Sequence, residues 1–154
     1  MFPTVATSSF ILHDYSSDYK TRLSSLKLLP LMYWLELQDI LYLIKCFKDP
    51  SDNFNVLNFL SFVQLKTRST SRNKLRVNFN KTSHSHHFYF NRIVRLWNAL
   101  PPLNLSLSFS TLKLHLKQLF WKHFTMHFNP NNLCTFHIVC PCPNCVNSNH
   151  TLSL

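Results

Sequence analysis

The sequence contains no glycine, and its 154 residues include only two alanines, Ala6 and Ala99. Glycine is the residue that reaches positive φ angles without steric cost, so we do not expect tight loops that cradle a phosphate group. Turns must instead use Pro, Asn, Ser and Asp, which reach turn geometry by other means. The composition therefore argues against a site built on a glycine-rich loop.

Acidic residues are also missing from most of the chain, because no Asp or Glu follows Asp52. Residues 1–52 carry five basic and six acidic side chains, whereas residues 53–154 carry eleven basic side chains and no acid. A surface with this asymmetry attracts polyanions, of which nucleic acid is the commonest. A basic surface that binds nothing is the alternative interpretation.

The scarcity of carboxylates bears on catalysis. Polymerase chemistry needs paired aspartates that hold two metal ions, and the nearest candidates, Asp49 and Asp52, lie in a predicted turn. Glu36 is the single glutamate and falls on an apolar helix, so we expect Glu36 and Asp39 to be solvated or to pair with other helices. The sequence therefore predicts a protein that is not an enzyme.

Long hydrophobic runs are absent as well. The longest apolar tract, residues 28–35, is interrupted by Pro30 and is too short to cross a bilayer, so no membrane partner is expected. Residues 1–15 lack a basic n-region and a continuous apolar core, which indicates an intracellular protein, either cytoplasmic or nuclear. Hydrophobic residues nevertheless make up 45% of the chain, enough for one modest domain with a core.

The periodicity of these apolar residues predicts a mainly α-helical fold with three to four helices. We expect a first helix over 19–29 capped by Asp18 or Ser17, a central helix over 31–47, and a last helix over 111–124 capped by Ser110. A short helix is expected within 54–63, and the alternation of Leu75, Val77 and Phe79 indicates a brief strand.

The predicted organisation has three parts. Residues 1–17 form a loose N-terminal lead-in, residues 18–125 form the helical domain with a basic loop, and residues 126–154 form a poorly ordered tail that contains most of the cysteines. Because no helical period continues beyond Phe128, we expect this tail to be separable from the helical domain.

One further helix is predicted in the segment FYFNRIVRLWNALPP at residues 88–102. Ile93, Leu96, Trp97 and Leu100 follow the spacing of one buried stripe, and the two prolines that follow stop the helix. This segment resembles a block found downstream of the polymerase core in non-LTR (LINE-type) retrotransposon reverse transcriptases. The motif LLPL at residues 28–31 adds to the resemblance, which covers about residues 10–125, although YWL at 33–35 replaces a basic run that is usual in that family.

The resemblance implies a C-terminal, thumb-adjacent region of a retrotransposon protein whose parent activity is RNA-directed DNA polymerase. The Tyr/Phe-x-Asp-Asp motif of the catalytic palm is missing, so this fragment would hold RNA or an RNA–DNA hybrid without polymerising DNA. The polymerase core of a parent reverse transcriptase would then be a partner. Two alternatives stay open: a truncated transposon remnant that acts only as a structural or interaction module, and a small zinc-dependent RNA-binding protein.

Basic side chains supply the candidate nucleic-acid contacts. Arg and Lys neutralise phosphates, while the Ser, Thr and Asn residues between them can hydrogen-bond to the backbone of the nucleic acid. A solvated loop is the competing interpretation for this region. The candidate residues are Lys66, Arg68, Arg72, Lys74, Arg76, Lys81, Arg92 and Arg95.

The C-terminal cysteines supply the candidate metal ligands. Cys134, Cys140, Cys142 and Cys145 fall within twelve residues and enclose His137, a combination of soft ligands that suits Zn²⁺. We expect Cys134, Cys142 and Cys145 to bind, with Cys140 or His137 as the fourth ligand; a reduced, unstructured tail without metal is the alternative. The histidines at 84, 86 and 87 lack nearby Cys or carboxylate residues and are weak candidates.

Overall fold

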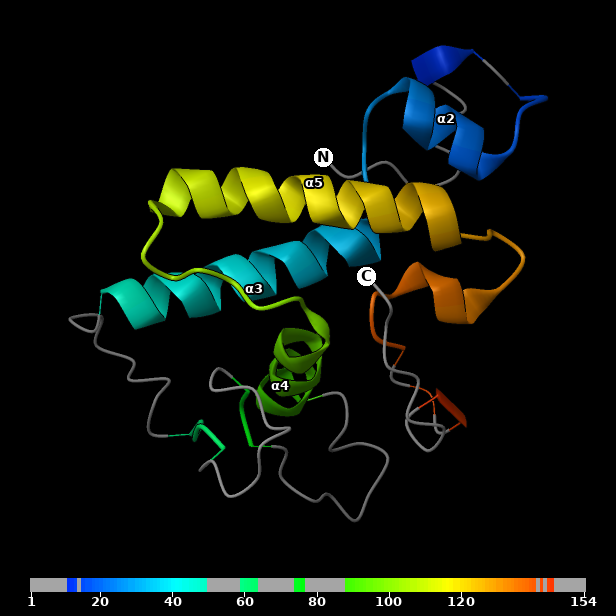
Figure 1. The fold of residues 1–154 in the computed structure, drawn as a ribbon. Helices are drawn as coiled ribbons and strands as arrows, with labels where there is room; N and C mark the ends of the chain where they lie inside the picture. The colour runs from blue at the N-terminus through cyan, green and yellow to red at the C-terminus, as the bar shows by residue number, and fades with distance from the viewer. Residues whose placement is uncertain are drawn as a thin grey trace.

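The computed structural model describes residues 11–13, 15–49, 59–63, 74–76, 88–140, 142 and 144–145. Within them it is mainly helical, which confirms the predicted fold class (Figure 1). The elements are the α-helices α2 (Tyr19–Ser25), α3 (Leu31–Lys48), α4 (Tyr89–Ala99) and α5 (Phe109–His127), followed by a short 3-10 helix, η3 (Leu133–Phe136).

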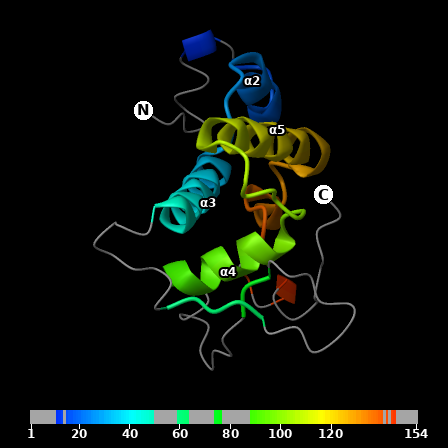
Figure 2. The same cartoon turned by 60° about the vertical axis from the view of Figure 1, so that its left-hand side comes forward.

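Helix α3 occupies the centre of the fold, as its largely apolar circumference predicts. Helices α4 and α5 both pack against it, and α5 runs in roughly the opposite direction (Figures 1 and 2). Tyr33 near the start of α3 contacts Phe120 and Phe124 near the end of α5, while Lys48 at the end of α3 donates hydrogen bonds to carbonyls that precede α5. The buried residues of α3 are Tyr33, Glu36, Leu37, Ile40, Leu41, Leu43, Ile44 and Cys46.

Helix α4 confirms the stripe predicted from the sequence. Its side chains at 93, 96 and 97 are buried, as is Leu100 directly after the helix, where the two prolines follow. The Trp97 side chain is 6% exposed, and its ring packs edge-on against Phe47 of α3 with 5.4 Å between ring centroids. The predicted core position of Trp97 is therefore confirmed.

The ends of two helices differ from the prediction. Asp18 caps α2 as expected, but the helix ends at Ser25. After this end, Lys27 takes φ 53°, and the Leu28 N–H donates a hydrogen bond to the Leu23 carbonyl. This pattern is the Schellman motif, which glycine usually closes; Lys27 fills the left-handed position in a chain without glycine. Helix α5 starts earlier than expected because Ser108, not Ser110, accepts the hydrogen bond that caps it.

The segment around residue 60 is not a helix where the structure describes it. Phe62 forms an isolated antiparallel bridge with Leu75, and Asn98 of α4 hydrogen-bonds both the N–H and the carbonyl of Leu75 at 2.8 Å. These pairings tie residues 59–63 and 74–76 to α4 (Figure 2). The bridge matches the strand pattern at Leu75, whereas residues 54–58 and the rest of that pattern, at 77 and 79, lie outside the described residues.

The chain after α5 packs against the helical core, which differs from the separable tail that the sequence predicts. Phe128 and Ile138 are 3% exposed and belong to the same hydrophobic cluster as α3, α4 and α5, and Phe136 packs against that cluster. Phe136 also lies against Tyr19 of α2, with 6.4 Å between ring centroids. These apolar residues are irregularly spaced, so an analysis of helical period does not detect them.

Candidate metal centre

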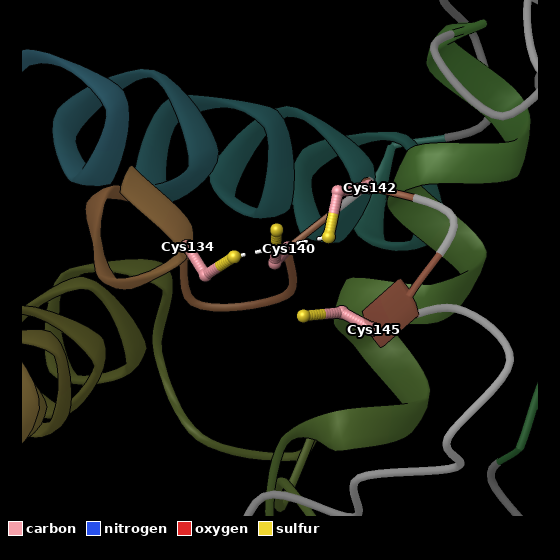
Figure 3. Close-up of side chains that lie close together, drawn as sticks. All are labelled: Cys134, Cys140, Cys142 and Cys145. Carbon is pink, nitrogen blue, oxygen red and sulfur yellow. Dashed lines mark hydrogen bonds between the residues drawn. The ribbon is translucent and has the colours of Figure 1, made fainter. Parts of the chain in front are cut away.

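Four cysteine side chains meet in the segment that follows α5. Cys134 lies in η3, and Cys140, Cys142 and Cys145 follow it; we call residues 134–145 the cysteine segment. Their sulfur atoms all lie within 4.8 Å of one another, and the Sγ atoms of Cys134 and Cys142 are 3.8 Å apart. Figure 3 shows the four side chains pointing toward one another beside α3 and α4.

The spacing of the sulfur atoms fits tetrahedral metal ligation. A Zn–S bond of about 2.3 Å in a tetrahedron places neighbouring sulfur atoms about 3.8 Å apart, whereas a disulfide bond would bring them to about 2.05 Å. None of these four cysteines is in a disulfide bond. The residues that the sequence singled out as ligands are therefore close enough together to hold one metal ion.

His137 is directed elsewhere. Its Nδ1 atom lies 3.1 Å from Glu36 Oε1. The residue that joins Cys134, Cys142 and Cys145 in the group of possible metal ligands is Cys140, not His137. The sequence left the fourth ligand open between these two residues. The structure gathers Cys140 with the other three cysteines and pairs His137 with a carboxylate of α3.

Glu36 is the residue that sequence analysis placed wrongly. It is 2% exposed, not solvated, and its Oε2 atom accepts a hydrogen bond of 2.7 Å from the backbone N–H of Ile138. A pattern was available, because positions 33, 36 and 40 share the buried face of α3. Asp39 does pair with another helix as expected, through a 2.6 Å contact between its Oδ2 atom and Arg92 of α4.

Polar side chains, in place of glycine, form the turns that lead into the cysteine segment. Thr135 Oγ1 donates to the Asn129 carbonyl and accepts from the Asn129 N–H, which closes the loop after α5. Asn132 accepts a 3.1 Å hydrogen bond from the Cys134 N–H and so begins η3. Asn and Thr side chains thus supply the turns that fix the position of Cys134.

The thiols influence one another's ionisation. A backbone hydrogen bond at Cys145 lowers the pKa of Cys142 to about 7. Hydrogen bonding with Cys142 raises the pKa of Cys145 to about 11, and burial raises the pKa of Cys140. Cys142 therefore ionises more readily than Cys140 and Cys145, and binding of a metal would release protons from those two because metal ligands are thiolates.

Arg95 of α4 brings a positive charge toward this cluster. Burial lowers the pKa of its guanidinium, while the neighbouring Cys140 thiol and Glu36 carboxylate act in the opposite direction. Arg92 is paired with Asp39. Both α4 arginines predicted to contact nucleic acid thus have anionic or ionisable neighbours inside the fold.

The remaining predicted site residues divide into two groups. Lys74 and Arg76 are exposed on either side of the buried Leu75. Lys66, Arg68, Arg72 and Lys81, together with the histidines at 84, 86 and 87, lie outside the described residues. The structure thus describes two exposed members of the predicted basic site.

A cavity of about 180 Å³ lies beside the sulfur cluster. It is lined by His123 and His127 of α5 and by Cys134, Cys140 and Cys145, among others. Burial lowers the pKa of His123 to about 4, and its Nδ1 atom shares a 2.8 Å hydrogen bond with the Tyr33 hydroxyl. The histidine is therefore neutral at neutral pH, and the cavity offers an entry path to the thiols.

Comparison with known proteins adds no relative. No family model matches the sequence, and neither the curated proteins nor the solved structures contain a match. In the part of the chain that the structure describes, no helix combines the length and the apolar character needed to cross a membrane.

Proposed function

We propose that this chain is a non-catalytic module in which one zinc ion attaches the cysteine segment to the helical core. The ion would be held by Cys134, Cys140, Cys142 and Cys145. The observation that carries the proposal is the convergence of four sulfur atoms within 4.8 Å of one another. Zinc is the metal we favour because closed tetrahedral sites of four thiolates are typical of structural zinc.

Zinc content tests this proposal directly. We expect reduced wild-type protein to hold about one equivalent of zinc after dialysis, because structural sites bind tightly. Cys140→Ser should lose most of it. Cys46→Ser is the matched control, since Cys46 is buried in α3 outside the cluster, and it should retain the metal. A zinc content below about a tenth of an equivalent in wild type, or iron in its place, would contradict the proposal.

We further propose that the module holds RNA or an RNA–DNA hybrid through its basic surface, as the resemblance to non-LTR retrotransposon proteins implies, with the polymerase core of a parent enzyme as its partner. One structural observation supports this role. Lys74 and Arg76 are both exposed on either side of the buried Leu75, so their charges are accessible to the phosphates of a nucleic acid.

Salt dependence tests nucleic-acid binding. If about six phosphates are engaged, log K should fall with log salt at a slope of about −4 to −5, because binding releases condensed counterions. Replacing Arg68, Arg72, Lys74 and Arg76 with Gln should flatten that slope. The control replaces Lys113, Lys117 and Lys122, which are exposed on α5, and should leave a slope closer to wild type.

The outcome separates the proposed function from its alternative. Unchanged RNA binding after the fourfold replacement would remove that segment as the binding site. No measurable RNA affinity, in protein that retains its zinc, would instead support a transposon remnant with only a structural or interaction role.

A further inference from the structure

A buried carboxylate links the central helix to the middle of the cysteine segment. Glu36 of α3 accepts a 2.7 Å hydrogen bond from the Ile138 N–H through Oε2, and its Oε1 atom lies 3.1 Å from His137 Nδ1. The glutamate side chain is 3% exposed. Both contacts fall between Cys134 and Cys140, which supply two of the four sulfur atoms.

We propose that Glu36 is a positioning residue for the metal centre: it holds the backbone at residues 137–138 in the conformation that brings the four sulfur atoms onto one ion. This inference rests on the proposed zinc site. A buried carboxylate without hydrogen-bond donors is costly, and so is a buried N–H without an acceptor. Docking of the cysteine segment satisfies both groups at once, so metal binding and docking should favour each other.

The apolar contacts around Glu36 support the same role. Ile138 is 3% exposed within the core cluster, and Val139 packs against that cluster directly before Cys140. The backbone hydrogen bond and the buried Ile138 side chain therefore hold the same short stretch against the helical core. Cys140 follows this stretch immediately, so its sulfur position depends on how the stretch is held.

The charge of Glu36 has an opposing effect. A carboxylate close to four thiolates repels them, which by itself would weaken a zinc–thiolate centre. Arg95 lies near both Glu36 and Cys140 and offsets part of that repulsion. The sign of the change in zinc affinity when the charge is removed therefore distinguishes positioning from repulsion.

The test compares two carboxylates on the same helix. Zinc affinity is measured by competition with a chromophoric chelator in wild type, Glu36→Ala and Asp39→Ala; alanine is used because glutamine would keep an oxygen that accepts from the Ile138 N–H. Groups that orient metal ligands typically account for a factor of 10–100 in affinity, so we expect Glu36→Ala to weaken zinc binding about tenfold. Asp39→Ala is the matched control, because its carboxylate contacts Arg92 and not the cysteine segment, and it should change the affinity less than about twofold.

A second readout separates positioning from a general loss of stability. The thermal midpoint is measured with and without zinc in each variant. A merely structural role would lower both midpoints equally, whereas a positioning role reduces the increase that zinc produces. If Glu36→Ala does not fold, His137→Ala removes one of the two contacts from the side of the cysteine segment and should show the same pattern to a smaller extent.

The possible failures are distinguishable. Wild type without zinc affinity would overturn the zinc site itself. Wild type that binds zinc, with Glu36→Ala binding equally well or more tightly, would overturn the role of Glu36 and leave the zinc site standing. Visible absorption of the cobalt(II) form shows whether tetrahedral thiolate ligation persists in the variant. Loss of a thiolate ligand there, with weakened affinity, supports the proposed role.

Discussion

Replacing Trp97 with alanine is expected to lower the free energy of unfolding by about 3–5 kcal/mol, the usual cost of truncating a buried large aromatic residue. Trp97 is 6% exposed and packs against Phe47, so its removal leaves a cavity between α4 and α3. Urea unfolding, followed by circular dichroism of the helices, measures the change.

A control at the start of the same helix isolates the effect of burial. Phe88 precedes α4 directly and is 67% exposed, so Phe88→Ala removes an aromatic ring from the surface. It should change the free energy of unfolding by less than about 0.5 kcal/mol. A loss below about 1 kcal/mol for Trp97→Ala would contradict the packing of α4 on α3 through this ring.

Helices α3 and α4, which meet at the Trp97 ring, were predictable from the sequence because their apolar residues repeat with helical period. The bounds of α3 differ from the prediction by one residue, and the α4 stripe is buried as expected. Helix ends were less predictable because they depend on single hydrogen bonds. Ser108 and Ser110 are both suitable caps for α5, and only the structure shows that Ser108 accepts from Thr111.

The candidate metal centre was predictable only in part. Four thiols within twelve residues indicate a soft-metal site by chemistry alone, and the fold brings them together. The hydrogen bond between Glu36 and Ile138 was not predictable, because it joins positions 102 residues apart. A local pattern cannot show which donor reaches a buried carboxylate, so a lone acid on an apolar helix reads as a surface group.

Zinc removal should destabilise the helices as well as the cysteine segment. Ile138 belongs to the core cluster and Phe136 packs against it, so a cysteine segment released from its metal withdraws apolar side chains from the surfaces of the helices. When free zinc exceeds its dissociation constant a thousandfold, binding adds about 4 kcal/mol to the free energy of unfolding. Chelation should therefore shift the unfolding of the helices, measured by urea titration with and without chelator, to lower urea.

Two serine variants decide whether the shift comes from the proposed centre. Cys46→Ser should show the same response to chelator as wild type, apart from its own lower stability, because Cys46 lies outside the cluster. Cys140→Ser should respond little, because it lacks one of the four ligands and begins in the destabilised state. If chelator does not shift the unfolding of the helices in zinc-loaded wild type, the cysteine segment is held by its apolar contacts alone. The metal would then order only its own ligands, and the core would fold without it.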